Sequence, residues 1–163
     1  MDKLPTSTVR FDIKLLAQAV AESDAVDALD LSLPPLQWEV IASYLQPMML
    51  RRGHLLIEQG VQDRSIYIVQ SGVLTVHFED NKDRIRIAQI KAGSIVGEGA
   101  FFSHLPRSAS VNATEDTIVW CLSPIRYREL CQRQPNAAIE LTNAMAAVLA
   151  KRMYNKPKRV AVT

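Results

Sequence analysis

Glu98 and Arg107 are the residues whose types and setting most clearly suggest chemistry. Both carry a charge within the largely apolar and small-residue stretch 96–111. Such charges need partners, because burying an unpaired charge is costly. Arg107 offers a planar fork of donors that suits a phosphate, whereas an ionised Glu98 can only accept hydrogen bonds. The pair therefore predicts a ligand with a phosphate beside a hydroxyl group, such as a sugar phosphate.

The backbone of the same stretch is expected to complete a phosphate cradle. Residues 97–102 suffice for about one to two helical turns, whose N-terminus would present free N–H groups to an anion. Gly97 and Gly99 carry no Cβ, so a ligand can approach the backbone closely. The alternative is an internal Glu98–Arg107 salt bridge without a ligand, although an ion pair kept only for stability rarely repays its desolvation.

Strands are expected on both sides of this stretch, because the chain changes character after Gly53. Short segments rich in β-branched residues alternate with Gly, Asp and Asn turns, a pattern typical of an antiparallel β-barrel or sandwich. These segments are 55–60, 65–72, 73–78, 84–90, 108–113 and 117–122. The stretch 96–111 would then connect a strand that ends near Val96 to one that begins near Arg107.

Helices are expected before and after the strands. Apolar spacing of three to four residues predicts one amphipathic helix or two short ones over 12–30, and a second short helix over 36–47. A Ser-Pro pair opens a further helix over 123–130, with serine as the N-cap and proline at the first helical position. A last helix is expected over 135–154, with an apolar stripe along one face.

The stretch 96–111 resembles the phosphate-binding cassette of the cyclic-nucleotide-binding domain family. The shared pattern is Gly-Glu, a small residue two places on, a short loop, then Arg, a small or hydroxyl residue, Ala, any residue and an aliphatic one. The matching residues here are Gly97, Glu98, Ala100, Arg107, Ser108, Ala109 and Val111. A second signature, LIEQG at 56–60 followed by IYIV at 66–69 and by Gly72, extends the resemblance to about residues 31–155.

The resemblance implies a 3′,5′-cyclic purine nucleotide as ligand, cyclic AMP rather than cyclic GMP, and no other cofactor. Glu98 would accept from the ribose 2′-hydroxyl, and Arg107 would pair with the exocyclic phosphate oxygens. Backbone N–H groups near Gly99 and Ala100 would complete the cradle, and the Ser108 hydroxyl would touch the phosphate or a guanine. The positions that match the apolar surroundings of base and ribose are Val76, Ile87, Ala88 and Val96.

The last helix is, by the same resemblance, a lid that closes over the base. Arg152 falls on its apolar face, where some family members bring an arginine or a hydroxyl residue onto the base, and it could stack on a purine. The other interpretation is an extended side chain at the helix end that reaches solvent and favours the C-terminal dipole. Both interpretations stay open.

Three parts are expected along the chain: an N-terminal helical extension (1–30), a cyclic-nucleotide-binding domain with its lid helices (31–155) and a basic tail (156–163). The fold class is mostly β, an antiparallel jelly roll with flanking helices. The expected function is a sensor, not an enzyme, which signals by movement of its last helix to an unknown protein effector or a second copy of itself. The few residues after the last helix leave no room for a helix-turn-helix, so direct DNA binding by this chain is not expected.

Composition speaks against several other classes of function. The net charge of +2 gives no reason to expect a broad nucleic-acid or membrane surface. The longest apolar run near the C-terminus, 144–150, is far too short to span a membrane, and the N-terminus lacks a signal-peptide core, which favours a cytoplasmic protein.

Two rival functions remain. The first is a small β-barrel metalloenzyme, although His54, His77 and His104 are scattered without a His-x-His pair, so neither a metal site nor catalytic residues are expected. The second is a degenerate domain that binds no ligand and serves as a scaffold or dimerisation module. Its only support is Gly99, which departs from the family pattern and loosens the cassette helix by roughly 1 kcal/mol relative to alanine. Asp63 also departs from that pattern, in a turn where no effect on binding is expected.

Overall fold

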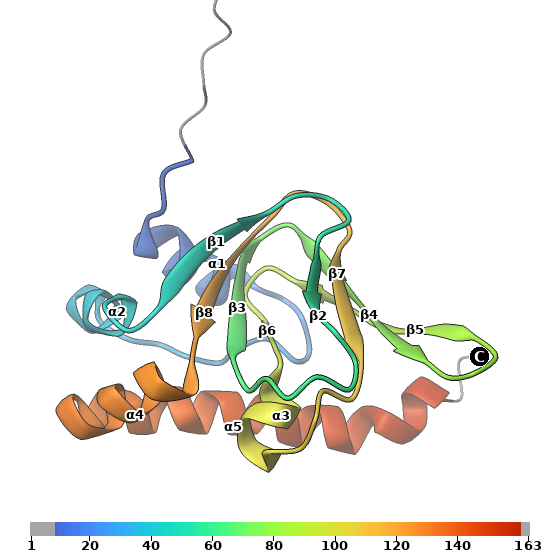
Figure 1. Ribbon diagram of the computed structural model, residues 1–163. Coiled ribbons are helices and arrows are strands. Elements are labelled where there is room, and N and C mark those ends of the chain that lie inside the picture. Colours follow the sequence, from blue (N-terminus) through green and yellow to red (C-terminus); the bar gives the residue numbers. More distant parts are fainter. Residues whose placement is uncertain (1–8, 161–163) are drawn as a thin grey trace, which may run out of the picture.

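Two antiparallel four-stranded sheets form a jelly roll with helices along one side (Figure 1). The computed structural model describes residues 9–160, and the side chains of residues 9–155. The expected fold class is confirmed. Within the described part of the chain, no helix combines the length and apolar character that crossing a membrane requires.

Each sheet contains strands that are distant in the sequence. The first sheet has the order β1 (Gln46–Leu50), β8 (Thr117–Leu122), β3 (Ile66–Ser71), β6 (Ile95–Val96). The second has the order β2 (Leu55–Ile57), β7 (Ser110–Ala113), β4 (Val73–Glu79), β5 (Arg84–Lys91). The connection from β6 to β7 therefore leaves the first sheet and enters the second, and the stretch that carries Glu98 and Arg107 lies in this connection.

Strand β3 joins two hydrophobic cores, because successive side chains of a strand point to opposite faces. Ile66 and Ile68 belong to the helical core between the first sheet and the helices, which also contains Trp38 and Trp120. Tyr67 and Val69 belong to the barrel core between the two sheets. These four side chains are all buried, so this part of β3 has no solvent face.

Five helices complete the described chain: α1 (Ile13–Glu22), α2 (Pro35–Ala42), α3 (Glu98–Ser103), α4 (Pro124–Arg133) and α5 (Pro135–Val160). The expected caps are present at α4, where the Ser123 hydroxyl accepts from the Arg126 amide. Helix α5 lies along the underside of the barrel in Figure 1 and contacts α3, which brings it to the β6–β7 connection.

Three expected boundaries were wrong. The first helix ends at Glu22 because Ser23 is already extended, and residues 23–34 form a loop rather than further helix. Pro47 does not end a helix but lies in β1, a strand that was not predicted from the sequence. A proline is tolerated there because β1 is an edge strand that pairs with β8 alone. Helix α5 continues beyond Tyr154 through Val160, so part of the expected basic tail is helical, and the rest lies outside the described residues.

Candidate ligand-binding site

One cavity of about 140 Å³ is lined by every residue that the sequence predicts to bind the ligand. They are Val76, Ile87, Ala88, Val96, Gly97, Glu98, Gly99, Ala100, Arg107, Ser108, Ala109 and Arg152. Three further residues line the cavity that were not predicted as binding residues: Ile57, Ile90 and Val111. Val111 is part of the cassette pattern, so that pattern could have identified it. A larger groove of about 720 Å³ lies between α1 and α2, away from both Glu98 and Arg107.

Gly97 turns the chain into the short helix α3. Its φ of 94° lies in the left-handed region, which side chains other than glycine rarely adopt. A Cβ at this position would lie 2.7 Å from Arg107 Nη1 and 2.7 Å from the Ser65 carbonyl oxygen, so there is no room for one. At Gly99, by contrast, a Cβ would meet nothing within 4 Å. Gly97 is therefore required by the backbone conformation of the cassette, whereas Gly99 lies next to open space.

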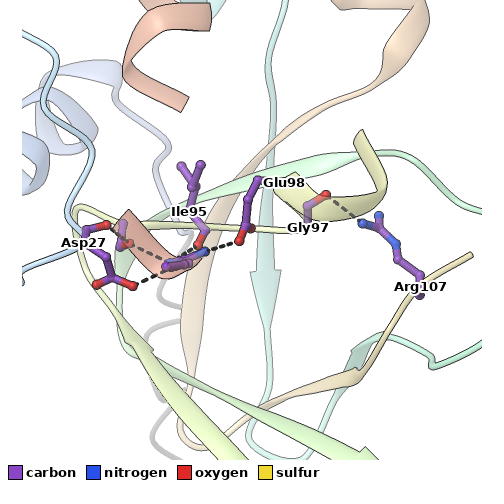
Figure 2. A network of polar contacts seen from close by, with 7 residues as sticks. Asp27, Ile95, Gly97, Glu98 and Arg107 are labelled. Atoms are coloured by element: carbon purple, nitrogen blue, oxygen red, sulfur yellow. Dashed lines mark hydrogen bonds and ion pairs between the residues drawn. The ribbon is translucent and has the colours of Figure 1, made fainter. Parts of the chain in front are cut away.

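Arg107 lies just before β7 and is only 4% exposed. Its Nη1 donates to the Gly97 carbonyl oxygen at 3.0 Å (Figure 2). Its Nη2 donates to Asp63 Oδ2 at 2.6 Å and to the Ser65 carbonyl oxygen at 2.6 Å. The third nitrogen atom, Nε, is buried and has no hydrogen-bond partner. The guanidinium is thus held firmly by the protein, while its Nε is left for another acceptor.

Asp63 is the carboxylate that balances the charge of Arg107. Burial alone would raise the pKa of Asp63, but hydrogen bonds from Arg107 and from Ser65 lower it below its ordinary value. The departure from the family pattern at this turn therefore has a clear structural role, which its position in the sequence did not reveal. Within the described residues no ion pair joins Arg107 to Glu98, so the alternative of a direct salt bridge between them is wrong.

Glu98 pairs instead with Arg152 of α5. Arg152 Nη1 lies 2.7 Å from Glu98 Oε1, and Nε lies 2.7 Å from Asp27 Oδ2. Its Nη2 donates to Ser94 Oγ at 3.1 Å and to the Ile95 carbonyl oxygen at 2.8 Å. Figure 2 labels three of the residues in this set of contacts, Asp27, Ile95 and Glu98. The side chain is only 10% exposed, so the interpretation of Arg152 as a solvent-reaching side chain is wrong.

The charge of Arg152 is stabilised by its two carboxylate partners. Burial alone would lower the pKa of Arg152, but the attraction of Glu98 and the hydrogen bonds to Glu98 and Asp27 outweigh burial and raise this pKa. Arg152 therefore stays protonated under all ordinary conditions. Glu98 Oε1 accepts from Arg152, and a carboxylate has a second oxygen that can accept from another donor.

An apolar floor leads from the cavity to the surface. Val76 of β4 and Ala88 of β5 face each other across the two strands, next to a register shift between Val76 and His77. Val96 and Ile87 also line the cavity; Val96 is buried, whereas Ile87 is 41% exposed. The site thus combines an enclosed polar part with an open apolar part, which suits a ligand with one end of each kind.

Comparisons with known proteins agree with this geometry. Residues 47–134, more than half of the chain, match the cyclic nucleotide-binding domain. The chain belongs to this family. The matched residues include the cassette, Asp63 and the strands of the barrel, but they do not include Asp27 or Arg152.

Two proteins with sequences similar to this chain are regulatory subunits of cAMP-dependent protein kinase. The subunit from Blastocladiella emersonii is 26% identical over 95 residues, which cover 58% of this chain and 24% of the relative. The subunit from Yarrowia lipolytica is 32% identical over 95 residues, covering 56% and 24% respectively. The chain thus spans about a quarter of the length of these relatives.

Two solved structures share the fold. A cyclic nucleotide-binding domain from Methylobacillus flagellatus has a TM-score of 0.79 at 21% identity and covers 91% of this chain and 82% of its own. The Thermus thermophilus catabolite activator protein has a TM-score of 0.69 at 26% identity, and the match covers 80% of this chain and 60% of that protein.

In the described part of this chain, no group of three or more His, Cys, Asp and Glu residues is placed to hold a metal ion.

Proposed function

We propose that this chain is a sensor domain that binds a 3′,5′-cyclic nucleotide, cyclic AMP rather than cyclic GMP, and that it is not itself an enzyme. The observation that carries the proposal is the buried Nε of Arg107, which has no partner although Arg107 lines the same cavity as Glu98. A buried donor without an acceptor is costly, and a phosphate oxygen would satisfy it. The preference for cyclic AMP is supported by the relatives named as cAMP-dependent regulatory subunits.

The proposed binding mode divides the ligand between the two parts of the site. The cyclic phosphate accepts from Arg107 and lies against the backbone at Gly99, where there is space without a Cβ. The ribose 2′-hydroxyl donates to Glu98. At about 140 Å³ the cavity is smaller than the roughly 300 to 1,000 Å³ typical of whole ligands, so the base lies at its mouth, over Val76 and Ile87.

The proposed signal is a movement of the last turns of α5 over the base, passed to a partner. The outward face of α5 supports a helical partner, because exposed residues follow one another at alternating intervals of four and three, as in a coiled-coil seam. These residues are Ile139, Asn143, Ala146, Ala150 and Met153. A second copy of this chain, or a protein effector with a matching helix, could pack along this seam.

Calorimetric titration and thermal melts with cyclic AMP and cyclic GMP test the binding proposal. A ligand at one hundred times its dissociation constant adds about 2.7 kcal/mol to the free energy of unfolding, so the melting temperature should rise. Linear 5′-AMP is the control, because it has the same base and sugar but not the cyclic phosphate. Cyclic AMP should bind at least as tightly as cyclic GMP, and a preference for cyclic GMP of more than about tenfold would reverse the assignment.

The alternative function is a scaffold that binds no ligand. It is favoured by the small volume of the cavity and by the protein partners that Arg107 and Glu98 already have. Melting curves that do not change at millimolar concentrations of either cyclic nucleotide would decide for this alternative.

A further inference from the structure

The candidate site is completed by two residues outside the matched family region. Asp27 belongs to the loop 23–34 that precedes the domain, and Arg152 belongs to the last turns of α5. Arg152 lines the cavity, but Asp27 does not. Asp27 nevertheless binds Arg152 Nε at 2.7 Å, and the same guanidinium binds the carboxylate of Glu98.

Asp27 is itself fixed by backbone contacts with the strand region of the cassette. Ser94 Oγ donates to the Asp27 carbonyl oxygen at 2.8 Å, and the Leu29 amide donates to the Gly93 carbonyl oxygen at 2.9 Å. The loop thus lies directly against the turn that leads into β6. Ser94 also accepts from Arg152, so backbone and side chain of Asp27 belong to one connected set of hydrogen bonds.

Such a connected set matters because an arginine side chain is otherwise free to adopt many rotamers. Fixing a long side chain costs up to about 2 kcal/mol of conformational entropy, so a contact to Glu98 alone would hold Arg152 weakly. Asp27, Ser94 and the Ile95 carbonyl group hold the guanidinium in place whenever the last turns of α5 lie against the barrel. Arg152 in turn occupies one oxygen of Glu98 and fixes the direction of the other.

We infer that Asp27 is a positioning residue for ribose recognition, acting through Arg152 to orient the free oxygen of Glu98 toward the ribose 2′-hydroxyl. This inference rests on the proposed function, since it concerns the same site and the same ligand. It adds a residue of the N-terminal loop to a site otherwise built from the barrel and α5. Base stacking by Arg152 stays a prediction, but a guanidinium held on both sides by carboxylates has little freedom to follow a base.

The test compares cyclic AMP with 2′-deoxy-cyclic AMP on the full chain, because the second nucleotide lacks only the hydroxyl that would donate a hydrogen bond to Glu98. Asp27→Asn should weaken binding of cyclic AMP about tenfold, because the neutral amide can still accept from Arg152 Nε but no longer attracts the guanidinium charge. Binding of 2′-deoxy-cyclic AMP should be unchanged. Asp30→Asn is the matched control, since it removes the same charge from an exposed position in the same loop and should affect neither nucleotide.

A second comparison isolates the role of Arg152. In a chain that already carries Arg152→Ala, the further change Asp27→Asn should have no effect on cyclic AMP, because the connection to Glu98 is already broken. Circular dichroism and melting temperatures of each variant verify that it is folded.

Three outcomes would overturn the inference. Equal losses for both nucleotides would make Asp27 a purely structural residue. Tighter binding of cyclic AMP by Asp27→Asn or Arg152→Ala would mean that Arg152 competes with the ribose for Glu98. Failure of the unaltered protein to bind either nucleotide would refute the proposed function itself, and the Asp27 inference with it.

Discussion

Arg107 serves both the fold and the proposed ligand. Two of its nitrogen atoms bind Gly97, Asp63 and the Ser65 carbonyl group, and the third faces no acceptor. A planar fork suits this double role, because its donors point in fixed and different directions. A lysine has a single charged end and could not make the same contacts at once. The position therefore accepts no conservative replacement by lysine.

Arg107→Ala should cost more binding free energy for cyclic AMP than Glu98→Ala. The first change removes the charged partner of the phosphate, worth roughly 2 to 5 kcal/mol, whereas the second removes a contact to a sugar hydroxyl. Arg107→Ala should also lower the melting temperature, since Asp63 and the Gly97 carbonyl group lose their partner. Titration calorimetry with melting curves on both variants measures the two effects. Equal losses of affinity would mean that the roles of the two residues are assigned wrongly.

Helix α3 shows how two glycines in one short element can have opposite effects. Gly97→Ala forces a side chain into the left-handed region and onto Arg107, and should cost about 1 to 3 kcal/mol of unfolding free energy. Gly99→Ala meets no neighbour within 4 Å and improves the helix, so it should gain about 0.5 to 1 kcal/mol. Chemical denaturation without ligand measures both. A loss of stability at Gly99 would show that this glycine has a structural role in the free protein.

The elements differ in how well local patterns predict them. The segments rich in β-branched residues over 73–78 and 84–90 predicted β4 and β5, because the strand preference of these residues can be recognised locally. Strand β1 was missed because its Pro47 is acceptable only on an edge, and whether a strand lies at an edge depends on its partners. The boundary of α1 was missed for a similar reason, since the loop after Glu22 is fixed by contacts with Gly93.

The sequence predicted which residues line the candidate site, but not which charged residues pair with one another there. Glu98 and Arg107 are close in sequence, and the pattern around them located the cavity. Their actual partners, Arg152 and Asp63, are distant in sequence and carry no local signal. A sequence alone can identify charges that need partners, but which charges meet depends on how the barrel, α5 and the loops pack together.

At the scale of the whole molecule, β3 makes the barrel and the helices depend on each other. The helical core contains Leu141 of α5 together with Ile66 and Ile68, while the neighbours Tyr67 and Val69 hold the barrel core. Loss of either core would therefore expose one side of the same strand. The domain is expected to unfold in a single transition rather than shedding its helices first.

Leu141→Ala should destabilise the helices and the barrel together, by about 2 to 5 kcal/mol, because it opens a cavity at a fully buried position. Fluorescence of Trp38 and Trp120 reports on the helical core, and amide exchange in β4 reports on the barrel. The free energy of unfolding measured by tryptophan fluorescence and the one measured by amide exchange in β4 should fall by the same amount. Ile125→Ala, at 70% exposed on α4, is the control and should have little effect. A barrel that stays protected after the tryptophan signal is lost would contradict this coupling.

The contact between Asp27 and Arg152 also has a consequence for biosynthesis. The two residues are 125 positions apart, and a chain is synthesised from its N-terminus. Every residue of the cassette leaves the ribosome well before Arg152. Until α5 follows, Glu98 lacks its cationic partner, and a nascent barrel has the phosphate-binding residues without the arrangement that orients the sugar. A growing chain would therefore acquire its full response to the ligand only after α5 has been synthesised.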